Sequence, residues 1–498
     1  MQTLPLIGGS YSTRSVLANC QRCINLYPEI NRPDSPSPTT HYQRPGLAVL
    51  SSPGSQGQGR ACYQASNGDG YAVAGQGVYY IDSSWTWNLI GTLNTVANNP
   101  VSIQDNGTQV MLVDGSQYGY TWNLADHGAA SWAVINDVSF TGADRVDTID
   151  TFLLWNVPGT RNFRSSLSNQ VTPMDPLYIA GKTNYPDPLE TLIVNRHLIL
   201  LLGSYKTEVW YDSGNAQFPF AELPGVYVEH GIVAKYSIAA AGEEVYWVGR
   251  NLQGQGVVYR QRGYKCERIS NYALEYQIRL MYAAGTIADA VGSTYQQDGH
   301  TFYVLSFPTG NQTWCWDSSV EDPQAGWSQR CWTDGQGQLQ RWRGVFCTAL
   351  YGKNVTLDWE YGTLYEQSLT TYTDTVYGAT GPISYIRSFP HLLAGRDAQG
   401  KPILAEGNMV RHDRFMLNAS VGTASSAGPQ FSLRWSDDRG VTWVEEQLLS
   451  AGEPGNYETR PEWAGLGMAM DRVYEVAWSF PGEVALNGAW VDGQVMQR

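Results

Sequence analysis

Basic residues are scarce in this sequence, and charged residues of either sign are few. Lys and Arg number 32 against 46 Asp and Glu, which gives a formal net charge of −14. Together these four residue types make up 16% of the 498 residues, below the quarter that is usual. A protein that holds nucleic acid by neutralising phosphates needs a Lys- and Arg-rich surface. The composition excludes that class, but it is compatible with an acidic wall past which nucleic acid slides.

Segments with an apolar pattern at helical spacing are also few, whereas turn-forming and aromatic residues are many. The chain has 52 Gly, 24 Pro, 31 Tyr and 18 Trp. Because a disordered chain has few aromatic residues, we expect a folded, β-rich and turn-rich protein. Its length is too great for one ordinary core, so we expect several domains or one large repeat domain.

Cysteines are sparse and odd in number, seven in the whole chain. This argues against a disulfide framework and favours assembly in a reducing compartment. Cys20 and Cys23 form a CxxC pair. A structural zinc site needs four ligands, usually from two such pairs, and a redox CxxC belongs in a βαβ context; the sequence has neither. We predict no metal, no redox function and no cofactor.

Long apolar runs are missing as well. No run approaches the roughly 20 residues of a membrane helix. The N-terminus, MQTLPLIGGSYSTRS, has neither a basic n-region nor a long apolar h-region, so it does not match a signal peptide. We expect a chain that is soluble when it is made and does not insert into membranes.

Catalytic motifs are not found either. The sequence has no G-x-S-x-G, no P-loop and no HExxH. A glycosidase needs two carboxyl groups across a cleft, but close pairs on a strand point to opposite faces, so we expect solvated turns at Asp147 and Asp150, Glu243 and Glu244, and Asp437 and Asp438. The histidines are scattered: His41, His127, His197, His230, His300, His391 and His412. We predict that the protein is not an enzyme.

Residues 1–50 are predicted to form an irregular N-terminal arm. Prolines punctuate this segment, and NRPDSPSPTTH is polar and Pro-rich. Such a segment cannot form a core of its own. Two hypotheses stay open, a flexible leader or an arm that docks on a neighbour through Leu4, Leu6, Ile7 and Tyr27.

Residues 51–373 contain a repeated unit of strand, Gly-containing turn and strand, rich in Val, Ile, Tyr and Trp. Further short strands flank most units, which recur at roughly 40–50 residues, as the blades of a β-propeller do. We predict about seven blades, with six or eight as alternatives and a string of β-sandwich hairpins as the competing fold. The units are YAVAGQGVYYID from Tyr71, VMLVDGSQYGYTW from Val110, FLLWNVPGTRNFRSS from Phe152, LILLLGSYKTEVWYD from Leu198, VYWVGRNLQGQGVVYRQ from Val245, FYVLSFPTGNQTWCWD from Phe302 and VTLDWEYGTLYEQS from Val355.

Two longer gaps between units, at Ile278–Ala290 and Glu321–Arg343, predict insertions on one rim. The second is rich in Trp and Gln, so it is either a contact surface or a set of tryptophans packed between blades. Beyond Thr373 the period is lost. Alternating strands then predict a smaller C-terminal β-sandwich-like domain over residues 374–498.

One motif in that domain matches the Asp-box pattern S-x-D-x-G-x-T-W, with Ser436, Asp438, Gly440 and Trp443 as its structural residues. The Ser and Asp side chains of such a box bond the hairpin's own backbone, Gly supplies a positive φ, and Trp packs beneath. Sialidases, which resemble this chain in being propellers, carry several boxes together with an arginine cluster and acid residues. Only one box is found here, it lies outside the repeat region, and the other sialidase residues cannot be assembled from spacing. A sialidase-like or glycan-binding propeller acting in receptor recognition is kept as the alternative function.

The chain resembles the packaged-DNA stabilisation proteins, or tail hub (nozzle) proteins, of short-tailed bacteriophages. The resemblance begins in LPLIGGSYSTRSVLANCQRCINLYPE and the Arg44-Pro45-Gly46-Leu47 element. It is strongest in LLLGSYKTEVWYDSGNAQFPF and the following GIVAKYSIA. There Lys206, Glu208, Tyr211 and Glu229 are expected to be blade-surface residues. The family has no catalytic residues to transfer.

This resemblance implies a structural virion protein in the phage tail, made and assembled in the host cytoplasm. It implies a homohexamer below the head-to-tail adaptor ring that closes and extends the DNA channel, supports a tail needle or tail fibres or spikes, retains packaged DNA and guides its ejection. Genomic DNA would pass through the lumen without sequence-specific binding. Six chains would carry 6 × (−14) = −84 formal charges, and a wall of that sign repels phosphates.

Overall fold

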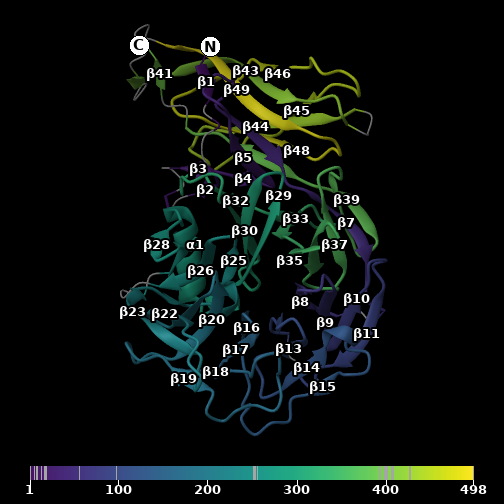
Figure 1. Ribbon diagram of the computed structural model, residues 1–498. Coiled ribbons are helices and arrows are strands. Elements are labelled where there is room, and N and C mark those ends of the chain that lie inside the picture. Colours follow the sequence, from purple (N-terminus) through teal and green to yellow (C-terminus); the bar gives the residue numbers. More distant parts are fainter. Residues whose placement is uncertain are drawn as a thin grey trace.

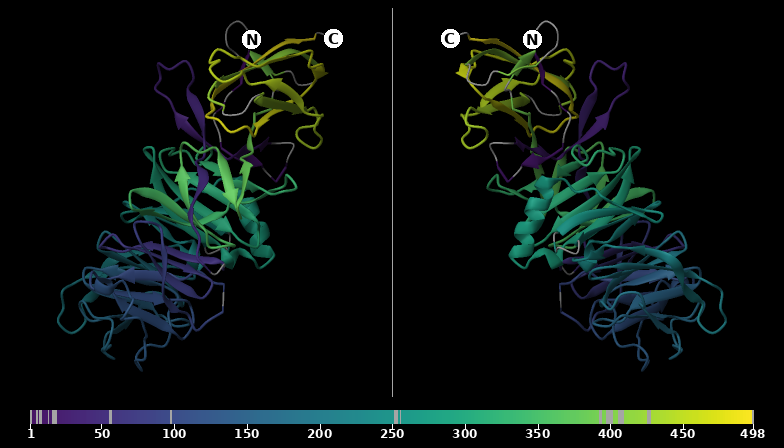
Figure 2. Two further views of the ribbon diagram at one scale, coloured as in Figure 1. Left: turned by 90° about the vertical axis from the view of Figure 1, so that its right-hand side faces the viewer. Right: turned by 90° about the vertical axis from the view of Figure 1, so that its left-hand side faces the viewer.

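The structure is a computed structural model that describes residues 2–496 apart from 5, 7–8, 13, 16–18, 55–56, 97, 251–253, 255, 392–393, 397–401, 405–408 and 425–427. Within these residues it is built from β-strands, one α-helix and three short 3-10 segments. A propeller and a sandwich lie at opposite ends of the chain's long direction (Figures 1 and 2).

Seven antiparallel sheets form the propeller, each numbered here as a blade from its innermost strand outward. Blade 1 is β8 (Gly59–Gln64), β9 (Gly70–Ala74), β10 (Gly77–Ile81) and β11 (Trp87–Thr92), and blade 2 is β12 (Ser102–Asp105), β13 (Gln109–Val113), β14 (Gly119–Asn123) and β15 (Ala133–Val134). Blade 3 is β16 (Val146–Ile149), β17 (Phe152–Asn156), β18 (Asn162–Ser165) and β19 (Ile179–Gly181), and blade 4 is β20 (Leu189–Asn195), β21 (Leu198–Gly203), β22 (Thr207–Asp212) and β23 (Phe220–Val228).

The innermost position of blade 5 is shared by two short strands, because β24 and β25 both pair with β26. Blade 5 is β24 (Gly231–Ile232) with β25 (Ala239–Ala241), then β26 (Glu244–Arg250), β27 (Gly256–Arg262) and β28 (Lys265–Arg268). Blade 6 is β29 (Val291–Gln297), β30 (His300–Phe307), β31 (Gln312–Asp317) and β32 (Trp327–Gln329). Blade 7 is β35 (Gly344–Leu350), β36 (Lys353–Asp358), β37 (Leu364–Ser368) and β7 (Gly46–Ser51).

The predicted repeat units coincide with the second and third strands of the seven blades. The unit from Leu198, for example, is the β21–β22 hairpin, in which Leu200 pairs with Val209. The apolar side chains of these strands are buried between blades, because a single blade cannot cover both of its faces. The predicted propeller of about seven blades is confirmed.

Closure of the ring joins the two ends of the propeller sequence. The innermost strand of blade 7, β35, lies against β8 of blade 1. The outermost strand of blade 7 is β7, which precedes blade 1 in sequence and pairs antiparallel with β37, Leu47 opposite Gln367. Figure 1 shows β7 and β37 side by side, far apart in colour. Closure of this kind leaves no open edge between first and last blade.

The C-terminal domain is a sandwich of two sheets whose alternating inward residues form one core, including Phe415, Leu417 and Tyr474. It confirms the predicted smaller β domain. One sheet contains β46 (Glu462–Ala464), β43 (Val410–Ser420), β49 (Ala485–Val495), β6 (Thr39–Gln43) and β5 (Leu26–Ile30), with β1 (Gln2–Leu4) and β47 (Met468–Ala469) at its sides. The other contains β40 (Tyr385–Ser388), β48 (Val473–Trp478), β44 (Gln430–Ser436) and β45 (Gln447–Ser450).

The N-terminal segment differs from the irregular arm that was expected. Its strand β4 (Cys23–Ile24) pairs with β32 of blade 6 on one side and with β40 of the sandwich on the other, which makes one continuous nine-stranded sheet. Leu4 and Leu6 are buried in the sandwich core of the same chain, and Tyr27 packs at blades 6 and 7. Ile7 lies outside the described residues. Within the segment β5 pairs with β6 and β2 (Tyr11–Ser12) with β3 (Cys20–Gln21), and strands distant in sequence supply the partners of β4.

Both predicted insertions are folded. The first begins within α1 (Tyr272–Ala283), a helix the sequence did not predict, whose N-cap Asn271 accepts a bond from the Leu274 N–H at 2.9 Å. The second contains the hairpin of β33 (Cys331–Thr333) and β34 (Leu339–Arg341), next to the fully buried Trp327 and Trp342. The remaining strands are β38 (Thr373–Val376), β39 (Ala379–Pro382), β41 (Ala394–Arg396) and β42 (Pro402–Leu404).

Candidate functional site: the propeller axis and the junction with the sandwich

The axis of the propeller holds a cavity of about 230 Å³. Every blade contributes to its wall, through Cys62, Ile103, Arg145, Thr191, Ala239, Ser293 and Cys347 among others. Lys235 of blade 5 reaches Asp144 of blade 3 beside it. A space of this volume among the innermost side chains is far smaller than duplex DNA, whose major groove alone is about 12 Å wide. The axis of a single propeller is therefore no passage for DNA.

Charged groups at this cavity connect blades to one another. Lys235, which precedes β25 of blade 5, places its Nζ 2.6 Å from Asp144 Oδ1 at the start of blade 3. Burial lowers the pKa of Arg145 and raises the pKa of the nearby Asp147 carboxyl. Asp147 was expected in a solvated turn, but it is buried and accepts bonds from the N–H groups of Val194 (2.9 Å) and Thr148 (2.8 Å).

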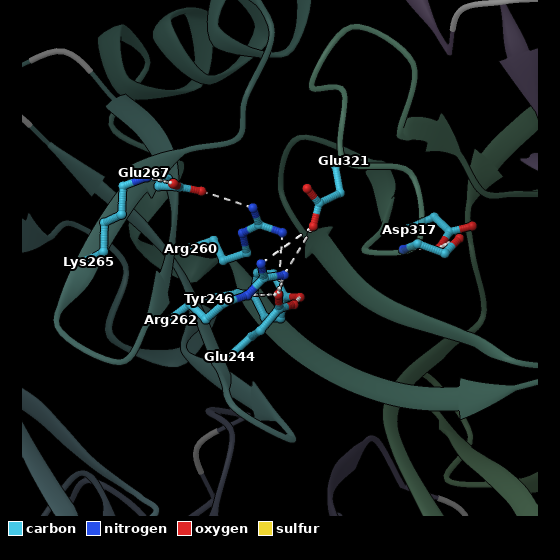
Figure 3. A network of polar contacts seen from close by, with 9 residues as sticks. Glu244, Tyr246, Arg260, Arg262, Lys265, Glu267, Asp317 and Glu321 are labelled. Carbon is cyan, nitrogen blue, oxygen red and sulfur yellow. Dashed lines mark hydrogen bonds and ion pairs between the residues drawn. The ribbon is translucent and has the colours of Figure 1, made fainter. Parts of the chain in front are cut away.

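A second carboxylate expected in a turn, Glu244, is also buried, and it lies at the centre of an ion network between blades 5 and 6 (Figure 3). Arg260 Nη1 donates to it at 3.3 Å, Arg262 Nε donates at 2.9 Å, and the Tyr246 hydroxyl donates as well. Arg262 also reaches Glu321 of blade 6 at 3.4 Å. Oε1 of Glu244 accepts from both arginines and Oε2 accepts from Tyr246, all within blade 5, and Arg262 carries the network on to blade 6. With both oxygens occupied, Glu244 is not placed to act as an acid or base.

A Ser-His-Asp cluster in blade 6 has the wrong geometry for nucleophilic catalysis. His300 Nδ1 lies 2.7 Å from Asp317 Oδ2, and the Ser319 hydroxyl lies 2.9 Å from the same nitrogen. A catalytic triad needs the serine at the other ring nitrogen, which here faces Glu29 of β5 at 3.6 Å. The cluster instead fastens blade 6 to the N-terminal segment.

The junction between propeller and sandwich is built around Arg44, whose side chain is 1% exposed. Its Nε donates to Asn25 Oδ1 at 2.9 Å, and its two terminal nitrogens donate to both oxygens of Asp374 at 3.1 and 2.5 Å. The carbonyls of Pro45 (2.9 Å) and Cys331 (3.1 Å) accept the remaining N–H groups. All five N–H groups are thus satisfied in the fork geometry that only arginine offers.

Asn25 completes this junction. Its backbone N–H donates to the Gln329 carbonyl of blade 6 at 2.8 Å, and its side-chain amide donates to the Ser384 carbonyl before β40 at 2.8 Å. Sequence reasoning quoted Arg44 only as part of a family resemblance and did not single out Asn25 or Asp374. An Arg-Pro-Gly run ahead of an apolar strand was the available signal for a buried arginine at a turn.

The Asp-box residues form a local turn between β44 and β45. The Asp438 carboxylate accepts bonds from the Thr442 hydroxyl (2.6 Å), the Thr442 N–H (2.8 Å) and the Ser436 hydroxyl (2.7 Å). These bonds, the Thr442 hydroxyl first, hold the pKa of Asp438 at about 2. Gly440 has a φ of 94°, and Trp443 is half-buried with the Arg434 guanidinium 4.9 Å from its ring centre.

The remaining residues named from the sequence are structural in their contacts. Glu208, expected on a blade surface, is buried and accepts the N–H groups of Thr183 (3.2 Å) and Asn184 (3.0 Å). Lys206 lies 3.9 Å from the exposed Glu229. In the described part of the chain, no group of three or more His, Cys, Asp or Glu side chains is placed to hold a metal ion, and no helix is long and apolar enough to cross a membrane.

Comparison with known proteins assigns the family. Residues 2–372 match the family described as bacteriophage P22 Gp10, beta-propeller, and residues 399–494 match bacteriophage P22 Gp10, beta-sandwich. No curated protein matches the chain.

Among solved structures, the extracellular domain of a putative hybrid two component system from B. thetaiotaomicron is similar, with a TM-score of 0.44 and 9% identity. The alignment covers 72% of this chain and 47% of that one, about half its length. That similarity is too low to carry an argument. The two family matches, in contrast, span nearly the whole chain and agree with both folded domains: the chain belongs to the bacteriophage P22 Gp10 family of DNA-stabilisation proteins, structural components of the phage tail.

Proposed function

We propose that this protein forms a homohexameric ring in the tail of a short-tailed phage, below the head-to-tail adaptor, where it closes and extends the DNA channel. The axial cavity is the observation that carries the proposal. Because about 230 Å³ cannot admit a duplex, a channel for DNA has to be bounded by several chains. Six is the copy number that the family resemblance implies.

The construction of the chain suits a channel wall. The nine-stranded sheet runs from blade 6 through β4 into the sandwich, and the Arg44 junction closes beside it without an unpaired N–H on that side chain. Continuous hydrogen bonding between two domains resists hinge motion, which is the default for domains joined only by a linker. A wall of this kind would keep its shape while DNA is retained behind it and later moves past it.

The charge of the chain supports passage without binding. Six copies at −14 each give a wall that repels phosphates, and a repelled duplex slides without sequence-specific contacts. DNA would be retained by mechanical closure of the lumen, to which a tail needle, fibres or spikes contribute. The glycan-cleaving alternative gains no support, because its Asp box lies in the sandwich and Glu244 is already paired with arginines.

The proposal is tested by measuring the mass of the purified protein alone and after mixing with its adaptor ring. We expect a complex in which six copies are bound per adaptor ring, whether the free chain is monomeric or already assembled. A protein that stays monomeric, does not bind the adaptor and hydrolyses host glycan would overturn the proposal.

A further inference from the structure

The helix α1 has an apolar face turned away from the propeller. Ala273, Leu274, Ile278 and Met281 are buried against blades 5 and 6. On the opposite side, Tyr272 is 65% exposed and Leu280 is 48% exposed. Tyr276 and the exposed Arg279 lie between them, with the guanidinium 5.3 Å from the Tyr276 ring centre. We call Tyr272, Tyr276, Arg279 and Leu280 the helix face.

A surface of opposite charge lies on the sandwich. The Asp-box turn and the strand β45 that follows it expose Val441, Val444 and Leu448 beside two glutamates, Glu445 and Glu446. Neither of these two carboxylates has an ion-pair partner among the residues that the structure describes. We call these five residues the sandwich tip.

The sandwich tip is pre-organised by its own turn. Asp438 accepts bonds from the Val441 N–H at 3.1 Å and from the Thr442 N–H at 2.8 Å, and the Ser436 hydroxyl accepts the Gly440 N–H at 2.7 Å. These bonds fix the loop that carries Val441, Val444, Glu445 and Glu446. A rigid surface loses less conformational entropy on binding than a flexible one, so an Asp box here favours a docking surface.

We propose that the sandwich tip of one copy docks on the helix face of the next copy in the ring. The inference rests on the proposed function, which supplies the ring. A closed ring uses two different surfaces of each chain at every contact. These two surfaces match in chemistry. The helix face offers Tyr, Leu and Arg279, and the tip offers apolar side chains and two glutamates, none of them ion-paired with another described residue. Tyr and Arg are also enriched at protein interfaces.

The two surfaces lie on different flanks of one chain. Figure 1 shows α1 at the left of the propeller and β45 at the right of the sandwich. They therefore cannot meet within a chain, and a contact between them joins one copy to the next in the same sense around the ring. This contact would give a role in assembly to the Asp box between β44 and β45 and to the helix α1 between blades 5 and 6.

Charge reversal tests the contact. We expect Arg279→Glu, and separately Glu445→Arg with Glu446→Arg, to weaken ring assembly on the adaptor by on the order of tenfold, and the combined variant to regain most of the loss. Arg161→Glu is the matched control, an exposed arginine of blade 3 outside both surfaces. Assembly is followed by mass measurement, with circular dichroism to confirm that each variant is folded.

A covalent test distinguishes the neighbour from other partners. Leu280→Cys and Leu448→Cys proteins are mixed on the adaptor and treated with a short bis-maleimide. We expect a 280–448 cross-link between chains and none when either variant is used alone. Assembly of the Arg279→Glu variant at the unaltered level, or cross-linking of position 448 to the adaptor instead, overturns the inference while leaving the proposed ring intact. Failure of the unaltered protein to assemble at all contradicts the proposed function itself.

Discussion

Arg44 and Asp374 form a buried bidentate ion pair, with Nη1–Oδ1 and Nη2–Oδ2 distances of 3.1 and 2.5 Å. Arg44 lies just before β7 and Asp374 lies in β38, so the pair ties the first strand to enter the propeller to the segment that leaves it. Asp374 also accepts the Leu47 N–H at 3.2 Å, which fixes the start of the closing strand.

Replacement of Arg44 is expected to destabilise both the closure of the propeller ring at β7 and the junction between the propeller and the sandwich. Arg44→Ala leaves Asp374 buried without its cation, a loss that costs about 3–5 kcal/mol. Arg44→Lys should recover only part of this stability, because an ammonium group cannot form the bidentate pair and also reach Asn25. The urea midpoint from tryptophan fluorescence measures the loss. Arg32→Ala is the control, since Arg32 is 89% exposed; equal midpoints for the Arg44 and Arg32 variants would contradict the assignment.

Gly46 is expected to tolerate no side chain. A Cβ at this position would lie 2.2 Å from the Thr371 carbonyl oxygen and 2.7 Å from that of Thr373, so Gly46→Ala has to displace backbone at the closing strand. We expect a loss of about 1–3 kcal/mol or more in the free energy of unfolding. Gly54→Ala is the matched control, because a Cβ there meets nothing within 4 Å. The clash is refuted if the two variants melt at the same temperature.

His300 is expected to make stability depend on pH near neutrality. Burial lowers the pKa of its imidazole, but the Asp317 carboxylate 2.7 Å away and Glu29 on β5 outweigh burial and raise it. A raised folded-state pKa contributes stability fully below the unfolded value of about 6.5 and loses it as pH rises through the folded value.

The difference in unfolding free energy between wild type and His300→Gln should therefore be larger at pH 6 than at pH 9. The Tyr27 hydroxyl beside the ring stays neutral across this range, because burial raises its pKa. Urea unfolding at both pH values measures the difference, and NMR titration of the ring gives the folded pKa. A difference that grows toward pH 9 would have the wrong sign.

The Asp box is expected to respond to acid and not to neutral pH. The pKa of Asp438 is held at about 2, below the ordinary 3.8, so its contribution is complete above the unfolded value and is lost as pH falls from 3.8 toward 2. Asp438→Asn removes this response and leaves Thr442 and Val441 without a charged acceptor. Hydrogen exchange of the Val441 and Thr442 amides should be faster in the variant at pH 7. Unchanged protection would show that Asp438 does not organise the turn.

The repeat of the propeller is predictable from sequence because its signal is local. Each β21–β22-type hairpin carries its own alternation and turn residues. The pairing of Leu47 with Gln367 is not local, so nothing near β7 indicates that it belongs to the last blade. The same holds for β4, whose two residues pair with strands of both domains.

Burial of carboxylates was predicted less well for a related reason. Alternation along a strand indicates which side chains share a face, but not whether a neighbouring blade covers that face. Glu208 therefore resembled a surface residue, because the groups that bond it, Thr183 and Asn184, lie outside its own blade. The Asp box was readable because all of its hydrogen bonds lie within a few residues.

Single-particle imaging of tails that contain this protein and DNA tests the central claim most directly. The account predicts six copies around one lumen, with DNA in that common lumen and none along the axis of any propeller. Copies that enclose no shared lumen, or DNA density threading a single propeller, would contradict it.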